Sequence, residues 1–310
     1  MRFLLTGGTG FLGSALVRKL DNHGHHLTVL SRQSSLPQAW KNMNVRLIDD
    51  IFSLRESDYF DVVINLAGEG IADRPWSPAR KAILRASRLA TTEELLRALR
   101  GLNTPPRLLL SGSATGVYGH STPGEVDETT AIISQQEDFA QQLCLDWEQA
   151  AWQAHSSMRV VLLRSGVVLG PGGMLKRMLP AFRLGLGGRL GDGLQMLSWV
   201  HIEDWVGMVM HILQTEQAQG PYNLTAPEPA SNRQLTQLLA SHLRRPSLLP
   251  LPRGLLQLTL GEMSQLLLGS QQVLPTALLA LGYEFRYPRL NEAISQLFPQ
   301  YAPRTPTRQN

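Results

Sequence analysis

Short apolar runs alternate with amphipathic stretches along the first half of the chain. Six of these runs have the length and apolar content of β-strands: residues 2–6, 26–30, 45–48, 61–66, 107–110 and 159–163. The stretches between them that repeat apolar side chains at helical spacing are residues 11–22, 77–99 and 139–154. Strands that alternate with helices predict an α/β fold with a doubly wound parallel sheet.

The pattern loosens after residue 164. Residues 170–173 and 185–193 are rich in glycine, and we expect them to form loops that reach over a site. Three later stretches again have helical periodicity: residues 202–213, 232–243 and 255–268. Prolines separate the predicted helices of residues 232–243 and 255–268 from each other and from the residues that follow. Short helical pieces divided by prolines are typical of a small second lobe.

We therefore predict two parts and a tail. Residues 1–225 form a Rossmann domain, in which the loops of residues 166–197 contribute to the substrate side. Residues 226–301 form a smaller C-terminal α/β lobe that caps the substrate, and residues 302–310 are a disordered polar tail.

Composition narrows the class of protein. The chain of 310 residues is 43% hydrophobic, which is enough for a large buried core. Its single cysteine, Cys144, excludes an intrachain disulfide, and its histidines show no metal-site spacing, so we expect a cytoplasmic protein without a metal. No apolar run approaches the roughly 20 residues that span a bilayer, and the net charge of +4 comes from scattered basic residues. We expect neither a membrane nor a nucleic acid as a partner.

Glycines connect the first predicted strand to the first predicted helix. They have a GxxGxxG spacing, which permits a tight turn and a close approach of a ligand to the backbone. The N-terminus of the helix offers unpaired N–H groups and a partial positive charge to a pyrophosphate. A glycine turn without a ligand is the alternative, and the complete strand-turn-helix-strand unit makes it the less favoured one. We assign six residues to a dinucleotide: Gly7, Thr9, Gly10, Phe11, Leu12 and Gly13.

The second predicted strand ends at Ser31 and Arg32. An NAD-dependent enzyme usually has Asp or Glu at this point to bind the ribose hydroxyls, and no carboxylate is present. Ser31 can donate a hydrogen bond to a phosphate, and Arg32 can pair with it. The sequence therefore predicts NADP(H) as the cofactor, and a solvated surface arginine is the alternative.

Several strings of residues resemble a known family. The run from Thr6 to Gly13, the string Asn65-Leu-Ala-Gly68 and the run from Ser111 to Gly119 look like those of extended short-chain dehydrogenases and nucleotide-sugar epimerases. The strings at residues 163–170, 182–188 and 199–204 resemble more narrowly the bacterial "epimerase family protein" group. That group contains atypical short-chain dehydrogenases with a C-terminal domain of their own.

The resemblance implies NADP(H) and a set of contacts with it. The implied contact residues are Ser31 and Arg32 at the 2′-phosphate, Asn65, Leu66, Ala67 and Gly68 near the ribose, Arg88 on the crossover helix and Val168 near the nicotinamide. Proteins of this kind have also been linked to cell or organelle division, for which these residues give no chemical reason.

The usual catalytic pair of the wider family is missing. Its members transfer a proton through a tyrosine whose pKa is lowered by a lysine four residues later. Phe139 and Leu143 stand where the resemblance places that pair. Ser113 and Tyr118 remain as candidate catalytic residues, although a strand-end cap and a half-buried spacer are equally compatible with them. Further acid-base candidates at the same edge of the sheet are Glu69, His201 and Asp204, the last of which could instead cap a helix.

Two functions are compatible with the sequence. The first is an NADP(H)-dependent oxidoreductase or epimerase that acts on a carbonyl or sugar-like small molecule with a substitute proton donor. The second is an NADP(H)-binding sensor or scaffold protein without turnover. Homodimer formation is compatible with both functions.

Overall fold

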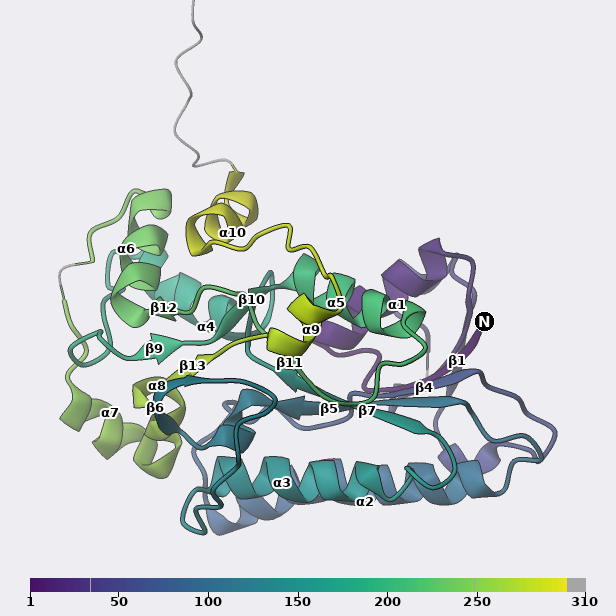
Figure 1. The fold of residues 1–310 in the computed structure, drawn as a ribbon. Helices are drawn as coiled ribbons and strands as arrows, with labels where there is room; N and C mark the ends of the chain where they lie inside the picture. Colours follow the sequence, from purple (N-terminus) through teal and green to yellow (C-terminus); the bar gives the residue numbers. More distant parts are fainter. Residues whose placement is uncertain (34, 248, 300–310) are drawn as a thin grey trace, which may run out of the picture.

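The structure, a computed structural model, describes residues 1–33, 35–247 and 249–299. Its centre is a seven-stranded parallel sheet with the order β11-β7-β5-β4-β1-β2-β3 (Figure 1). The strands are β1 (Arg2–Thr6), β2 (His26–Leu30), β3 (Val45–Ile48), β4 (Val62–Asn65), β5 (Leu108–Ala114), β7 (Arg159–Ser165) and β11 (Gly220–Leu224). The prediction of a doubly wound Rossmann sheet is confirmed.

Two layers of helices cover the sheet. One face packs against α1 (Phe11–Asn22) and α5 (Ile202–Gln214), and the other against α2 (Pro78–Arg100) and α3 (Phe139–Trp152) (Figure 1). Phe3 and Leu5 of β1 are buried on the first face, whereas Leu4 is buried on the second. Alternate side chains of a central strand thus enter opposite cores, which explains the almost continuous apolar runs.

The chain between the sheet and the second lobe is more regular than the sequence indicates. Helix α4 (Gly173–Arg183) begins where we expected loop, and β8 (Val167–Leu169) pairs in parallel with β10 (Trp199–His201). Strand β11 was not predicted, because Gly220 and Pro221 interrupt its apolar pattern. Strand β11 forms an edge of the central sheet, whereas β8 and β10 form a separate two-stranded sheet.

The helix predicted over residues 255–268 is wrong as a single element. The chain forms α7 (Arg253–Leu260), a 3₁₀ turn (Gly261–Ser264) and α8 (Gln265–Leu268). Gly261 has φ 55° and ψ −134°, a conformation that L side chains rarely adopt and that ends α7. The apolar period continues past this glycine, so the pattern alone could not show the break.

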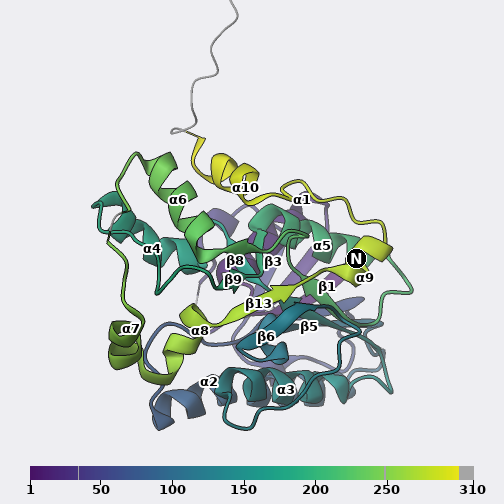
Figure 2. The ribbon, with the colours of Figure 1, turned by 60° about the vertical axis from the view of Figure 1, so that its left-hand side comes forward.

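The C-terminal lobe packs closely against the Rossmann domain. It contains β12 (Ala230–Ser231), α6 (Asn232–Leu243), β13 (Ser270–Val273), α9 (Thr276–Ala280) and α10 (Leu290–Leu297), and its β12 pairs with β9 (Met196–Leu197) of the preceding segment. Strand β13 pairs with β6 (Ser121–Val126), which follows β5 (Figure 2). Leu278 of α9 enters the main core under α5. The predicted tail, residues 302–310, lies outside the described residues.

Two kinds of feature are absent from the part of the chain that the structure describes. None of its helices is long and apolar enough to cross a membrane. No group of three or more His, Cys, Asp or Glu side chains in these residues could hold a metal ion.

Candidate functional site

The glycine loop between β1 and α1 contains glycines of two kinds. A Cβ at Gly7 would lie 2.4 Å from the carbonyl oxygen of Leu66, and φ there is +68°. A Cβ at Gly13 would lie 2.3 Å from the carbonyl oxygen of Gly7. Gly10 differs, since its φ is −73° and a Cβ would meet only one atom of the protein, at 3.2 Å. The fold requires the first two glycines, whereas the space at Gly10 remains open for a ligand.

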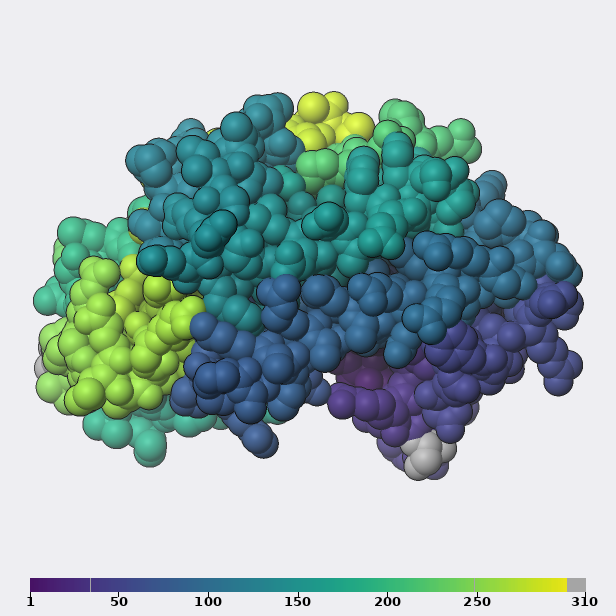
Figure 3. All heavy atoms as spheres, turned by 90° about the horizontal axis from the view of Figure 1, so that it is seen from below, coloured from purple at the N-terminus to yellow at the C-terminus, as the bar shows by residue number. Residues whose placement is uncertain are grey.

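A cleft lies next to this loop. Figure 3 shows the surface hollowed between the purple atoms of the first residues and the blue atoms of the segment that follows β4. Gly10 is exposed and is the N-cap residue of α1. The first N–H groups of the helix have no partner within the helix, so this exposed end can donate hydrogen bonds to an anionic group.

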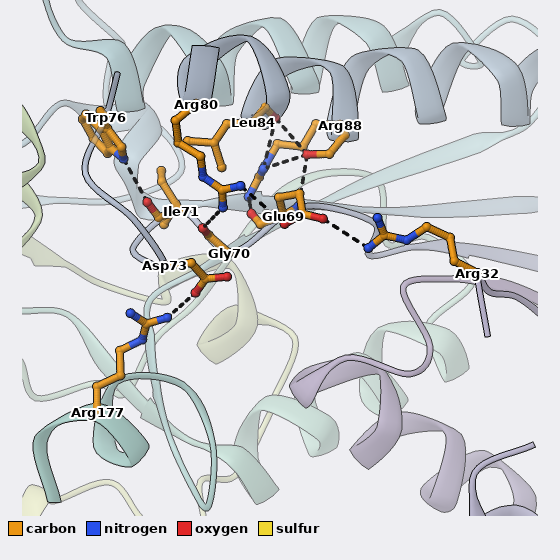
Figure 4. Close-up of polar contacts among 11 residues, drawn as sticks. Arg32, Glu69, Gly70, Ile71, Asp73, Trp76, Arg80, Leu84, Arg88 and Arg177 are labelled. Carbon is orange, nitrogen blue, oxygen red and sulfur yellow. Dashed lines mark hydrogen bonds and ion pairs between the residues drawn. The ribbon is translucent and has the colours of Figure 1, made fainter. Parts of the chain in front are cut away.

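Arg32 reaches across the site to the segment after β4. Its Nη2 lies 3.1 Å from Oε1 of Glu69, and its side chain is 93% exposed (Figure 4). The hydrogen bond from Arg32 holds the pKa of Glu69 below its ordinary value. Ser31 is buried, and its hydroxyl accepts the N–H of Gln33. The sequence could not show that Glu69 would be a partner of Arg32.

Three further arginines hold the segment 69–77 in place. Arg80 donates to the carbonyl oxygen of Gly70 at 2.7 Å, and Arg88 donates to that of Glu69 at 3.1 Å (Figure 4). Arg177 of α4 pairs with Asp73 from the opposite side. Helices α2 and α4 thus fix the wall of the cleft that faces the glycine loop.

The side chain of Arg80 is only 10% exposed. Its Nη1 is 3.5 Å from Oε2 of Glu69, and its buried Nε has no hydrogen-bond partner in the described chain. The carboxylate of Glu69 therefore bridges two arginines from different elements. Arg80 did not stand out in the sequence, because it lies on the polar side of an ordinary helical pattern.

Asn65 and Arg88 lie beside the start of this segment. The Asn65 amide accepts a hydrogen bond from Thr6 at 2.6 Å and donates one to Thr92 at 2.8 Å, so its side chain joins β1 to α2. The guanidinium of Arg88 packs against Gly68, where a Cβ would lie 3.0 Å from Cζ. Burial lowers the pKa of Arg88, although the group stays charged at any physiological pH.

Phe11 and Val168 belong to the same hydrophobic core. A Cβ at Gly172 would lie 2.5 Å from the Phe11 ring, so the turn before α4 wraps this ring closely. Val168 is buried in β8 and packs with the core that Phe11 contacts. The structure thus brings the predicted nicotinamide contact to the same core as the glycine loop.

Ser113 and Tyr118 belong to one buried polar network. The Ser113 hydroxyl donates to Glu148 at 2.6 Å, and Arg164 binds both oxygens of that carboxylate at 2.9 Å. Arg164 also donates to the Tyr118 oxygen at 2.9 Å, and the phenol donates to Asn223 at 3.0 Å. Burial raises the pKa of Tyr118, the opposite of what a catalytic tyrosine needs.

Glu148 and Arg164 were missed by the sequence reasoning. Arg164 gave a signal that could have been used, since it is a charged residue at the end of an apolar strand. Its partner gave none, because Glu148 reads as the polar side of an amphipathic helix. Only packing of α3 on β7 shows that the two charges are paired.

Phe139 and Leu143 are buried together with Leu84 of α2. The ring of Trp76 contacts Phe139 edge-on, with centroids 5.0 Å apart. The ammonium of Lys81 lies 4.9 Å from the centroid of Phe139 and pairs with Glu262 of the second lobe. An apolar contact and a neighbouring cation thus occupy the place of the usual pair.

His201 and Asp204 are structural residues rather than free acids or bases. Asp204 is fully buried, and its carboxylate accepts hydrogen bonds from Tyr283 and from the backbone N–H groups of Arg286 and Tyr287. The expectation that Asp204 caps the helix is wrong, because His201 is the N-cap and accepts the N–H of Glu203. Both residues attach the C-terminal segment to α5.

A separate cavity lies between the two lobes. Its volume is about 220 Å³, and its walls come from the turn before β6 and from residues 253–269. His120, Ser121 and Arg253 line it together with Ser264 and Gln265. The Oε1 atom of Gln265 is buried without a hydrogen-bond partner among the described residues. The cavity can therefore offer hydroxyl, amide and cationic groups to a small polar molecule.

Comparison with known proteins agrees with this geometry. Residues 3–225 match the model of the NAD dependent epimerase/dehydratase family. The chain belongs to this family. Residues 251–297, which include most of the cavity wall, match a domain of unknown function named DUF1731.

Relatives cover the chain almost completely. The "Epimerase family protein SDR39U1" of Bos taurus is 37% identical over 302 residues, which are 96% of this chain and 99% of the relative. The "Epimerase family protein YfhF" of Bacillus subtilis is 36% identical over 300 residues, with 96% and 98% covered. The resemblance found in the sequence, to the epimerase family protein group, is confirmed.

Solved structures show the same fold. The human epimerase family protein SDR39U1, crystallised with NADPH, superposes with a TM-score of 0.87 at 35% identity and covers 96% of this chain and 99% of its own. UDP-glucuronic acid 4-epimerase from Bacillus cereus, with UDP-glucuronic acid and NAD, has a TM-score of 0.76 at 20% identity over 97% of this chain. The second likeness shows the fold alone.

Proposed function

We propose that this family member is an NADP(H)-dependent oxidoreductase or epimerase-like enzyme that acts on a small carbonyl or sugar-like molecule. The observation that carries the proposal is the exposed guanidinium of Arg32 at the end of β2, where a carboxylate would select NAD. A 2′-phosphate placed there would receive a charge-assisted hydrogen bond. The relative that was crystallised with NADPH supports the same choice.

The residues of the cleft fit this cofactor. Gly10 leaves room for a pyrophosphate at the N-terminus of α1, since a Cβ at this glycine would meet only the carbonyl oxygen of Gly7. Gly68 and Arg88 lie beside the segment that would face the ribose, and the apolar side chains of Phe11 and Val168, which share one core, would suit a nicotinamide ring. When bound, NADPH supplies a hydride.

The cavity between the lobes supports a small polar substrate. Its volume of about 220 Å³ is below the roughly 300–1,000 Å³ of drug-sized ligand sites. Hydroxyl and amide groups in its walls match the donors and acceptors of a sugar or hydroxy acid. Arg253 at its rim adds a cation that favours an anionic group on that substrate.

Ser113 and Tyr118 are our candidates for substrate polarisation and proton transfer. Two observations favour the alternative, a cofactor-binding protein without turnover: the Ser113 hydroxyl already donates to Glu148, and burial raises the pKa of the Tyr118 phenol. A general acid typically contributes about 10²–10⁴ in rate. If the protein is an enzyme, removing either hydroxyl should lower its rate. If it only binds the cofactor, there is no rate to lower.

The test is to titrate the purified protein with NADPH and NADH, then to screen carbonyl substrates for NADPH oxidation. The enzyme hypothesis expects preference for NADPH and turnover of a small polar substrate that falls about 10²–10⁴-fold in Ser113→Ala or Tyr118→Phe, with cofactor binding intact. Equal affinity for both cofactors would overturn the NADP(H) assignment. Binding of NADPH without turnover of any substrate would favour the sensor.

A further inference from the structure

Exposed leucines are concentrated in two chain segments, residues 184–194 and 249–258. Among the residues that the structure describes, fourteen large hydrophobic side chains are exposed, and half of them lie in or beside α4 and α7: Leu184, Leu186, Leu194, Leu249, Leu251, Leu255 and Leu258. Leu184 and Leu258 are 74% and 84% exposed. Single exposed leucines are ordinary, but seven in two segments that contact each other are more than a soluble surface requires.

The two chain segments that carry these leucines are neighbours in space. Leu190 forms a bridge with Leu251, and the N–H of Leu251 donates to the carbonyl oxygen of Arg189 at 2.8 Å. A Cβ at Gly188 would lie 1.7 Å from the carbonyl oxygen of Leu249, so only glycine permits this approach. Figures 1 and 2 show α4, α6 and α7 together at one end of the molecule.

The same segments concentrate the positive charge of the protein. Residues 183–194 and 233–258 contain six of the 29 basic residues and one of the 25 acidic ones, a net charge of +5 in a chain whose total is +4. The six are all exposed: Arg183, Arg189, Arg233, Arg244, Arg245 and Arg253. The described side chains form no ion pair with any of them. Basic residues that look scattered in the sequence thus converge on the leucine-bearing end.

We propose that this leucine-arginine face docks on an anionic lipid bilayer surface. Arginines among protruding leucines complement a surface that is negatively charged outside and apolar just beneath. An acidic amphipathic helix has similar chemistry, but such a helix needs a groove for its apolar side. Side chains that are 61–84% exposed, such as Leu186, Leu249 and Leu258, stand out from the surface instead. The bilayer fits that shape better.

The proposal changes the expectation drawn from the sequence that no membrane is a partner. The proposed docking is attachment to one side of a bilayer and requires no helix that crosses it. The leucine-arginine face and the cofactor cleft are formed by different residues. Substitutions in the face are therefore expected to change membrane docking and to leave NADPH binding unchanged.

The experiment is sedimentation of the full chain with vesicles of phosphatidylcholine, with and without phosphatidylglycerol. We expect binding to the anionic vesicles only, and weakening as salt is raised. Because each basic residue near such a surface is worth about 1 kcal/mol, Arg183→Gln and Arg244→Gln should each weaken binding about fivefold. Leu184→Ser and Leu258→Ser should also weaken vesicle binding, because each removes an apolar side chain that would enter the bilayer. The control Leu279→Ser changes a leucine of α9 that is 48% exposed and lies outside the face, and it should bind normally.

NADPH titration of every variant shows whether its fold is intact. Absence of binding to anionic vesicles would overturn the proposal. Binding that survives all four substitutions in the face would overturn it as well. A homodimer in light scattering that the leucine substitutions dissociate, without vesicle binding, would show that a second copy covers this face instead.

Discussion

Arg32 and Glu69 join the ends of two strands that are not neighbours in the sheet. The guanidinium follows β2, the carboxylate follows β4, and Nη2 and Oε1 are 3.1 Å apart. A 2′-phosphate on Arg32 would compete with Glu69 for the same donor. Under the proposed function, the choice between NADPH and NADH would therefore also depend on Glu69, a carboxylate that lies 37 residues from Arg32 in the sequence.

Arg32→Ala should weaken NADPH binding and leave NADH binding almost unchanged. Loss of a charge-assisted hydrogen bond costs about 1.5–3 kcal/mol, which is tenfold or more in affinity. Fluorescence titration with both cofactors measures this difference. Arg46→Ala is a matched control, because Arg46 is an exposed arginine of β3 outside the cleft. An equal loss for NADPH and NADH would mean that Arg32 acts on the fold rather than on the phosphate.

Glu69→Gln should strengthen NADPH binding. The substitution removes the charge that competes for Arg32, and exposed ion pairs are worth about 0–1 kcal/mol, so the gain is at most about fivefold. Asp73→Asn, which removes a carboxylate of the same segment that pairs with Arg177, is the control. A weaker affinity in Glu69→Gln would show that Glu69 orients Arg32 and does not compete with the phosphate.

Gly10→Leu and Gly7→Ala should both lose NADPH binding, but for different reasons. A Cβ at Gly10 would meet one atom, the carbonyl oxygen of Gly7 at 3.2 Å, so this variant should lose much less stability than Gly7→Ala and should lose nucleotide affinity. A Cβ at Gly7 meets a carbonyl oxygen at a positive φ, so Gly7→Ala should be strongly destabilised. Thermal unfolding beside NADPH titration separates the two effects. Unchanged affinity in Gly10→Leu would remove the pyrophosphate from this position.

Arg164→Leu should destabilise the protein by about 3–5 kcal/mol, because it leaves the buried Glu148 carboxylate without its cation. The double variant Arg164→Leu with Glu148→Leu should recover much of this loss, since neither charge is then left unpaired. Denaturant unfolding of the two single variants and the double variant measures the coupling. If the two losses are simply additive, the pair does not stabilise the junction of α3 and β7.

Stability should fall as the pH drops below 6.5. Burial lowers the pKa of His201 from its ordinary value of 6.5, so the unfolded chain binds a proton that the folded chain resists. The stability from the neutral ring is complete above pH 6.5 and is lost as the pH falls toward the lower folded pKa. His201→Asn keeps an N-cap acceptor for Glu203 but cannot titrate. A melting temperature that falls equally in both proteins would assign the pH effect to other groups.

Much of the sheet could be predicted because its signals are local. Apolar runs predicted all the strands from β1 to β7 that form the central sheet, and the helical spacing over residues 77–99 predicted α2, whose N-cap Ser77 accepts the N–H of Arg80. Strand β11 escaped prediction, because Gly220 and Pro221 hide a strand that tertiary pairing with β7 stabilises. Periodicity describes one element and cannot show such a neighbour.

The candidate site was predictable only where backbone conformation selects the residue type. Gly7 and Gly13 are glycines because the chain folds back on itself there, so their spacing could be recognised. Glu69 was recognised as a polar group, but its pairing with Arg32 and Arg80 depends on how β2, β4 and α2 meet. Ser113 was likewise found without its partner Glu148. Ion pairs between residues that are distant in the chain depend on how the elements pack. They cannot be recognised from the local pattern of a single sequence.

The attachment of the C-terminal segment limits how this chain can be recombined with its relatives. Leu278 completes the core beneath α5, and Asp204 holds the backbone of Arg286 and Tyr287. If residues 251–297 were replaced by those of another family member, a different side chain could take the place of Leu278 in this core. Its volume would not match the surrounding side chains, which were selected together with Leu278. The two matched regions are therefore expected to be inherited together, and exchanging the lobe to alter substrate choice requires the underside of α5 to be exchanged with it.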